Sequence, residues 1–209
     1  MEGLMRLKAM AKINLGLDVL GKREDGYHEV RMIMQTIRMY DILDIRKTRR
    51  PGIVLTTNLP FIPTDQRNLV YKAAQMLMEE FDVEEGLSIK LRKFIPVAAG
   101  MAGGSSDAAA AFVGVNRMFH LGLTEEQLME RAVKVGADVP YCIMRGTALA
   151  EGIGEKLTRL PEVPKCYVLI GKPGINVSTK TAYENLNLEG IGKHPDIDGL
   201  IGAIRNNDL

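Results

Sequence analysis

A stretch rich in small residues offers the clearest chemistry in the sequence. It reads "FIPVAAGMAGGSSDAAAAF", covers residues 94–112, and lies between an expected strand and an expected helix. Backbone amides and the positive end of a helix dipole at such a junction can hold an anion. Side chains that would keep phosphate oxygens from the main chain are missing at Gly100, Ala102, Gly103 and Gly104. The hydroxyls of Ser105 and Ser106 are expected to cap the helix, or to meet a phosphate or a magnesium ion.

The same loop has a second interpretation. No Gly-Lys-Ser/Thr follows the glycines, and their spacing does not fit the dinucleotide-binding fingerprint. A tight strand-to-helix turn with serine caps accounts for the composition as well as a phosphate cradle does. The loop alone therefore leaves both possibilities open.

Three polar residues elsewhere have types that suit phosphoryl transfer to an alcohol. Lys12 and Asn14 are two apart on an expected strand, so they share a face about 6–7 Å apart. They either form a solvated face, or align a hydroxyl and stabilise phosphate charge. Asp138, in "VGADVP", is either a turn former or a base that accepts an alcohol's proton. If it lies near Lys12, the opposite charge would keep it ionised.

Tyr27 and His28 follow a glycine in "GYH". A histidine at the start of a strand is usually structural or solvated. With an adjacent aromatic ring, however, it would also suit a stacked base whose edge accepts and donates hydrogen bonds.

Composition excludes several classes of protein. The chain has 209 residues, 46% hydrophobic and 25% charged, with a formal net charge of +1. Near-neutral charge argues against a nucleic-acid binder, and no apolar run approaches the roughly 20 residues of a membrane helix. Cys142 and Cys166 lack the spacing of a zinc or disulfide framework and are expected to be reduced thiols. Because the start of the chain resembles neither a signal nor a transit peptide, we expect a cytoplasmic protein.

Periodicity predicts an interleaved set of elements. Alternation predicts a strand over 5–20, followed by strands over 28–37, 41–47 and 52–57 in an antiparallel region. A helix is expected over 67–81, capped by Thr64 or Asp65, and a second one from the serines to residue 119. Thr124 and Gln127 match a capping box that opens a third helix. The other expected strands cover 86–95, 141–144, 147–160 and 165–173, and short helices are expected over 178–186 and 196–207. This pattern favours the α+β class over a doubly wound sheet.

Five stretches together resemble one enzyme family. They are "AKINLGLDVLGKREDGYHEV", "RNLVYKAA", "IPVAAGMAGGSSDAAAA", "GADVPYC" and "GKPGINVSTKTAY", and they span most of the chain. In type and order they resemble the GHMP small-molecule kinases, and "GYH" resembles the branch whose alcohol substrate carries a cytidine diphosphate group. The resemblance implies an N-terminal domain like ribosomal protein S5 domain 2 over 1–161. The ferredoxin-like C-terminal domain would begin at 162 and be incomplete at 209, because the family continues beyond "RNNDL".

The resemblance also implies roles for individual residues. Lys12 and Asp138 match the catalytic pair, with Asp138 as the base and Asn14 positioning the alcohol. The positions that match cytidine recognition are Tyr27, His28 and Tyr183, with Thr179 nearby. ATP would bind at Asn68 and Leu69, and along the loop from Pro96 through Gly100, Ala102, Gly103, Gly104 and Ser105 to Ser106.

The resemblance further implies ATP as cosubstrate with Mg2+, whose protein ligands it leaves unknown apart from Ser106 as a candidate. The partners would be small molecules, with neither nucleic acid nor membrane involved. Two alternatives stay open: a related kinase with a different alcohol, and a non-catalytic binding module, since S5-like domains also occur in nucleic-acid proteins.

Overall fold

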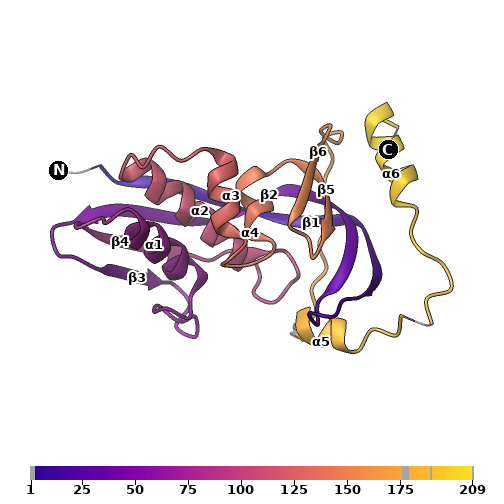
Figure 1. Ribbon diagram of the computed structural model, residues 1–209, viewed down its shortest axis with the longest axis horizontal. Coiled ribbons are helices and arrows are strands. Elements are labelled where there is room, and N and C mark those ends of the chain that lie inside the picture. The colour runs from indigo at the N-terminus through magenta and orange to yellow at the C-terminus, as the bar shows by residue number, and fades with distance from the viewer. Residues whose placement is uncertain (1–2, 176–178, 189, 209) are drawn as a thin grey trace. The chain divides into compact units, whose positions relative to one another are not determined.

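Two long strands organise the chain, which a computed structural model describes over residues 3–175, 179–188 and 190–208. Strand β1 covers Met5–Lys22 and pairs with β2, which covers His28–Thr48 (Figure 1). The expected first strand is confirmed. The two strands expected over 28–37 and 41–47 form one continuous strand, since β2 also includes the residues between them.

The other strands extend this sheet. They are β3 (Ile53–Thr57), β4 (Gly86–Arg92), β5 (Thr147–Gly152) and β6 (Lys156–Leu160), and the hydrogen-bonded order is β3-β4-β2-β5-β6. Strand β4 pairs antiparallel with β2, with Ile45 opposite Ile89. The expectation that residues 52–57 pair antiparallel is wrong, because β3 runs parallel to β4. The helix between these two strands returns the chain to the same edge, which permits a parallel pair.

Six helices lie in the described part of the chain: α1 (Leu69–Glu80), α2 (Gly103–Met118), α3 (Glu125–Ala132), α4 (Val139–Met144), α5 (Thr179–Glu184) and α6 (Ile197–Asn206). The predicted capping box is confirmed: the Thr124 hydroxyl accepts from the Gln127 amide, and the Gln127 side chain accepts from the Thr124 amide.

Two predicted strands are wrong. Residues 141–144 belong to the short helix α4, where Pro140 lies in the first turn and its missing N–H costs no intrahelical hydrogen bond. Residues 165–173 form no strand, and the side chains of Tyr167 and Leu169 are fully exposed.

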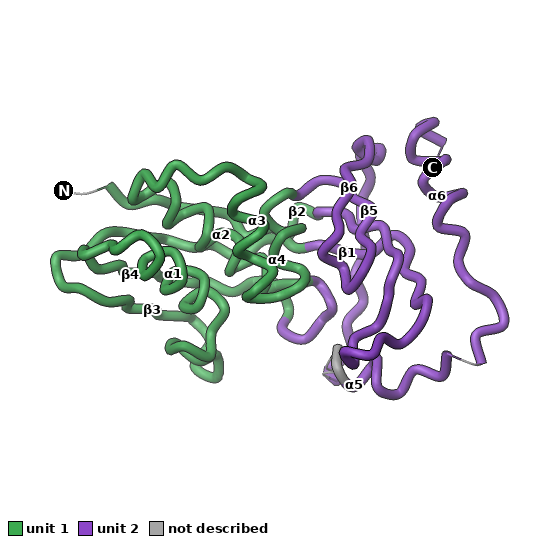
Figure 2. Tube along the Cα trace, in the orientation of Figure 1, with its two compact units in different colours: residues 1–11, 37–96, 102–144 green, residues 12–36, 97–101, 145–209 purple. Residues whose placement is uncertain are grey.

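The chain divides into two compact units, drawn in green and purple in Figure 2. Unit 1 comprises residues 1–11, 37–96 and 102–144, and unit 2 comprises residues 12–36, 97–101 and 145–209. Both long strands contribute to both units. The division expected from the sequence, into a domain over 1–161 and the start of another over 162–209, differs from these two units and stays a prediction.

In unit 1, α1 and α2 pack together against the sheet (Figure 1). The small side chains of Ala108–Ala111 are buried, as expected for a helix lying close to strands. The approach is closest at Gly114, where an added Cβ would lie 2.5 Å from Ile45 Cδ1 and 2.7 Å from Leu7 Cδ1. Helix α2 is therefore held at a fixed depth on the sheet.

In unit 2, β5 pairs antiparallel with the first half of β2 and with β6. Helix α6 packs its apolar face on Ile33 and Leu149, through the side chains of Ile197, Ile201 and Ile204. The Arg31 guanidinium also donates two hydrogen bonds to the carboxylate of Asp198, at 2.6 and 2.8 Å.

The structure confirms the α+β class. Over its described residues, none of the helices has the length and apolar character needed to cross a bilayer.

Candidate active site

The loop between β4 and α2 has an unusual backbone. Ala98 and Ala102 have φ values of 53°, and Gly100 has a φ of 69°. Left-handed conformations are easy for glycine but disfavoured for alanine, and a non-glycine residue held there often marks a functional site. The loop is thus more strained than a simple turn requires.

The start of α2 corrects the expected serine caps. Ala102 is the N-cap and makes no side-chain hydrogen bond, so the first amides of the helix have no serine oxygen over them. The Ser106 hydroxyl instead donates to the main-chain oxygen of Met10, and the residue is 2% exposed. Helix geometry leaves the first amides without intrahelical partners, and the first turn carries no acidic residue. An anion is therefore favoured at this end.

The surroundings of the two glycines in this turn, Gly103 and Gly104, differ. A Cβ at Gly103 would lie 3.1 Å from Lys93 Nζ and 3.2 Å from Ile95 Cγ2, so packing restricts this position. Gly104 is exposed, and its nearest neighbour would be Leu69 Cδ1 at an ordinary 3.7 Å. The fold itself does not require glycine at position 104. Leu69 and Gly104, two of the predicted ATP-binding positions, are therefore neighbours in the fold.

Asn68 immediately precedes α1 and caps it. Its Oδ1 accepts from the Val70 amide at 2.9 Å, and its Nδ2 donates to the Pro63 oxygen at 2.8 Å. The predicted caps Thr64 and Asp65 are therefore wrong. Asp65 binds Arg67 instead, and these hydrogen bonds lower the pKa of its carboxyl to about 2.

A buried cluster of charged residues lies behind the loop and was not predicted. The Lys93 ammonium donates to Asp107 Oδ2 at 2.7 Å and also contacts Asp41 Oδ2. All three residues are at least 93% buried. Burial raises the pKa of the Asp107 carboxyl well above its usual range, although the Lys93 ammonium opposes the shift. The only sequence signal was an aspartate beside a run of helical alanines.

Lys12 and Asn14 lie together on β1, as their spacing predicted. The Lys12 ammonium donates to Asn14 Oδ1 at 3.1 Å, and Lys12 is 5% exposed. The Lys12 amide donates to the Met101 oxygen at 3.2 Å. The catalytic candidate on β1 and the end of the glycine loop are therefore joined within unit 2.

Asp138 lies at the turn before α4. It is half-buried, and its main-chain oxygen accepts from the Cys142 amide at 3.1 Å. Asp138 belongs to unit 1, whereas Lys12 belongs to unit 2. Its predicted role, and its ionised state beside Lys12, stay predictions.

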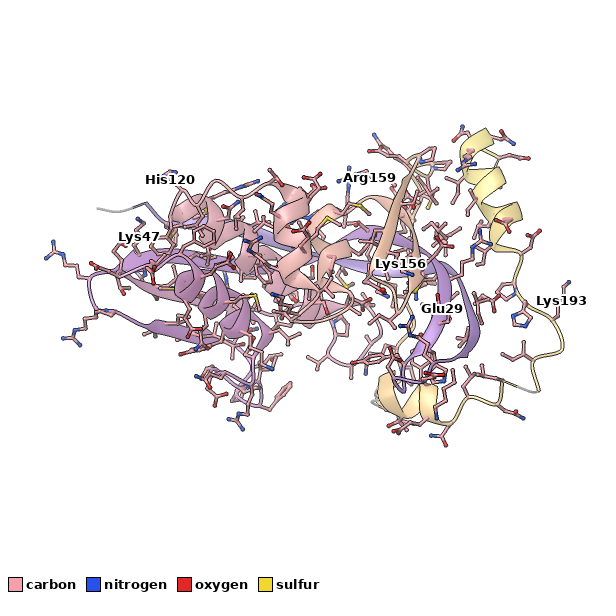
Figure 3. The ribbon with its side chains drawn as sticks, in the orientation of Figure 1. Glu29, Lys47, His120, Lys156, Arg159 and Lys193 are labelled. Atoms are coloured by element: carbon pink, nitrogen blue, oxygen red, sulfur yellow. The ribbon has the colours of Figure 1, made fainter. Side chains whose placement is uncertain are left out.

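Of the three cytidine candidates with rings, His28 and Tyr183 come together in unit 2, whereas Tyr27 does not line the cavity beside them. The His28 and Tyr183 rings stack, with centroids 5.0 Å apart and planes 28° from parallel. Tyr27 is 59% exposed, in a turn braced where Arg23 donates to Asp25 and to Glu29, which is labelled in Figure 3. Thr179 is the first residue of the neighbouring helix α5, and its side chain lies outside the described part of the structure.

These rings border an open cavity of about 420 Å³. Sequence reasoning missed most of its lining, which comprises Lys22, Gly26, His28, Tyr183, Glu184, Leu186, Asn187 and Leu188. The size suits a nucleobase and part of its sugar. Lysine, glutamate and asparagine side chains supply both donors and acceptors at the rim.

The structure gives less support for a metal-binding site than for the phosphate and cytidine sites. Within the ranges that the structure describes, no group of three His, Cys, Asp or Glu side chains could hold a metal ion. Ser106, the one candidate, directs its hydroxyl hydrogen to Met10.

Comparisons with known proteins agree with this picture. Residues 68–146 match the family described as GHMP kinases N terminal domain. The 4-diphosphocytidyl-2-C-methyl-D-erythritol kinase of Lachnospira eligens is 56% identical over 205 residues, which cover 98% of this chain and 71% of that protein. The enzyme of the same name from Lachnoclostridium phytofermentans is 57% identical over 206 residues, covering 99% and 71%.

Solved structures give a consistent result. A crystal structure of 4-(cytidine 5'-diphospho)-2C-methyl-D-erythritol kinase matches with a TM-score of 0.79 and 30% identity, over 98% of this chain and 72% of that one. A homoserine kinase from Cytophaga hutchinsonii matches with a TM-score of 0.68 at 19% identity, over 97% and 69%, and this similarity concerns the fold alone.

Proposed function

Because the chain belongs to the 4-diphosphocytidyl-2-C-methyl-D-erythritol kinase family, we propose that it transfers the γ-phosphoryl group of ATP to the C2 hydroxyl of 4-diphosphocytidyl-2-C-methyl-D-erythritol. ADP is the co-product, and the reaction serves the non-mevalonate route to isoprenoid precursors in the cytoplasm. The observation that carries this proposal is the stacked His28 and Tyr183 pair beside the cavity, because it offers a cytosine site within a kinase fold.

The phosphates of ATP bind at the loop from Pro96 to Ser106. The left-handed backbone at Ala98 and Ala102 and the free space at Gly104 support this assignment. Adenosine lies toward Asn68 and Leu69, and this is supported because a Cβ at Gly104 would lie 3.7 Å from Leu69 Cδ1, which makes these positions neighbours of the start of α2. The positive end of α2 offsets the phosphate charge.

The cytidine group binds in the cavity of unit 2. Tyr183 and Tyr27 provide ring faces, and His28 hydrogen-bonds to the base edge, with Thr179 nearby. Aromatic contacts of this kind can each contribute about 1–3 kcal/mol to holding a base. The cytidine handle thereby positions an alcohol that has few recognisable groups of its own.

Asp138 is the proposed base and accepts the C2 hydroxyl proton. The hydroxyl oxygen then forms a bond to the γ-phosphorus, and the bond from that phosphorus to the bridging oxygen breaks to release ADP. Lys12 stabilises the charge that develops on the transferring group, and Asn14 orients the alcohol. In a loose transition state most of the rate enhancement comes from such positioning and charge stabilisation.

Magnesium is expected to accompany ATP and to neutralise part of the phosphate charge. We assign it no protein ligand, because the Ser106 hydroxyl donates to Met10 in this structure. We also propose that residues 1–161 form one domain and that a second domain begins at residue 162.

Binding titrations test the two halves of the site separately. We expect cytidine diphosphate to bind the unaltered chain, and the Tyr183→Ala variant to bind it at least about tenfold more weakly, since one stacked ring is lost. ATP should bind both proteins equally. Equal cytidine diphosphate affinity for the two proteins would mean that the stacked His28 and Tyr183 pair does not form the cytosine site. That result would favour a kinase with a different alcohol substrate.

A further inference from the structure

Asp41, Lys93 and Asp107 form a buried cluster, called here the charge buckle, that joins both ends of the loop over 94–102 within unit 1. We propose that the charge buckle is a positioning device for ATP: it fixes where the loop leaves β4 and where α2 begins. This inference rests on the proposed function, because the loop must be the phosphate site for its shape to affect binding.

Asp41 holds the first end of the loop. Its Oδ1 accepts from the Phe94 amide at 2.5 Å and from the Ile95 amide at 2.8 Å. Its other oxygen contacts the Lys93 ammonium. A fully buried carboxylate on β2 therefore determines the direction of the chain as it leaves β4.

Asn58 reinforces the same end. Its Oδ1 accepts from the Lys93 amide at 2.7 Å, and its Nδ2 donates to the Lys93 oxygen at 3.1 Å. The main chain of Lys93 is thus held by one side chain while its ammonium is held by two others.

Lys93 and Asp107 hold the second end. Asp107 belongs to α2, and its Oδ2 accepts from the Lys93 ammonium at 2.7 Å. The ammonium also lies 3.1 Å from where a Cβ of Gly103 would be, so it abuts the first residue of the helix. The distance between the end of β4 and the start of α2 is consequently set by one side chain.

Stability alone is a poor explanation for this cluster. Apolar side chains of similar volume often stabilise a protein as well as buried ion pairs do. In addition, Asp107 Oδ1 is buried with no hydrogen-bond partner among the described residues, which is costly. A cation near a helix N-terminus is also unfavourable unless carboxylates compensate for it. Charges retained under these conditions are better explained by the geometry that they impose.

The members of the cluster are positioning residues. The Lys93 side chain is 5% exposed and its ammonium is directed to two carboxylates, so it does not reach a ligand. Its influence on ATP must pass through the loop and the first turn of α2.

Three variants test the proposal. Asp107→Ala cuts the link to α2 but leaves Lys93 paired with Asp41, so the buried charges still balance and the chain is expected to fold. Asp107→Asn keeps an oxygen that can accept from Lys93. Val115→Ala is the matched control, because Val115 is a fully buried residue of α2 outside the loop and the cluster.

Amide hydrogen exchange and ATP titration are measured on each variant and on the unaltered chain. In Asp107→Ala we expect faster exchange over 94–106 with unchanged exchange in α1, and ATP binding about tenfold weaker, the scale of one charged hydrogen bond. Asp107→Asn and Val115→Ala should stay within about twofold of the unaltered chain for ATP.

Unchanged exchange over 94–106 in Asp107→Ala would overturn the proposal, as would an equal loss of protection in Val115→Ala. If the unaltered chain does not bind ATP, the proposed function fails, and hydrogen exchange still decides whether the charge buckle holds the loop.

Discussion

The fold positions the individual side chains of the candidate site with different rigidity. Lys12 is 5% exposed on a long strand and is hydrogen-bonded to Asn14, so the fold fixes its position before any ligand arrives. Asp138 is half-buried in a turn before a six-residue helix. A strand is a more rigid support than a turn, which suits a group that stabilises charge without moving.

The Asp138→Asn variant tests the proposed base. We expect kcat to fall by about 10²–10⁴, the usual contribution of a positioned acid or base, with an unchanged unfolding temperature. Steady-state kinetics with the cytidine substrate measure this loss. Asp82→Asn is the control, because Asp82 is an exposed turn residue with a φ of 47° that asparagine tolerates. A loss below threefold in the Asp138 variant would exclude the role.

Gly104 provides a test in which stability and binding change in opposite directions. Alanine in a helix is favoured over glycine by about 0.5–1 kcal/mol, and a Cβ here meets only Leu69 at 3.7 Å. We therefore expect Gly104→Ala to unfold at the same or a higher temperature but to bind ATP more weakly. If ATP affinity is unchanged in calorimetric titration, the phosphates do not pass over this residue.

The raised pKa of Asp107 predicts a pH dependence of stability. Above the ordinary value of 3.8, the unfolded chain releases this proton while the folded chain retains it, because burial raises the pKa in the fold. The stabilisation is complete below 3.8 and is lost as the pH rises through the folded pKa. Urea unfolding at several pH values should show the unaltered chain losing stability relative to Asp107→Asn as the pH rises. A difference that does not vary with pH would contradict this account.

At the level of elements, periodicity predicted most of the sheet. Alternating residues predicted β1, because its side chains face opposite sides of a half-buried sheet. The strand segment expected over 147–160 forms β5 and β6, which pair antiparallel. The run "YCIM" failed, because all six residues of α4 are buried and a short apolar run does not separate helix from strand. The run over 165–173 has strand-like composition, but in this structure it pairs with no strand.

Only the parts of the candidate site that lie in short segments of the sequence could be predicted. Local patterns identified Lys12 with Asn14, and the glycine loop, because their chemistry lies in short segments. Asp41 lies 52 residues from Lys93, so no local pattern announces their contact. The serine caps failed because the chain enters α2 through a left-handed Ala102, a conformation that composition does not predict.

Helix α6 tests the packing of unit 2. Ile201 belongs to the apolar cluster on Ile33 and Leu149, so Ile201→Ala should cost about 2–4 kcal/mol and expose the helix. We expect faster hydrogen exchange in α6, with unit 1 unchanged. The control is Gly202→Ala, since an added Cβ there meets nothing within 4 Å. Equal protection of α6 in both variants would show that this packing does not hold the helix.

For the whole molecule, the fold alone does not identify the alcohol. A homoserine kinase shares the fold at 19% identity, so related architectures accept different substrates. Substrate choice must come from local groups, and the cavity beside His28 and Tyr183 is the feature that suits a cytidine. The 56–57% identity to named cytidine-substrate kinases supports the same choice.

Substrate-dependent release of ADP tests the central claim most directly. The chain is supplied with ATP, magnesium and one of three alcohols: 4-diphosphocytidyl-2-C-methyl-D-erythritol, homoserine or mevalonate. Phosphorus NMR identifies any phosphorylated product. We predict ADP release and a new C2 phosphate monoester with the cytidine substrate only. Faster release with homoserine or mevalonate, or no stimulation by the cytidine substrate, would contradict the account.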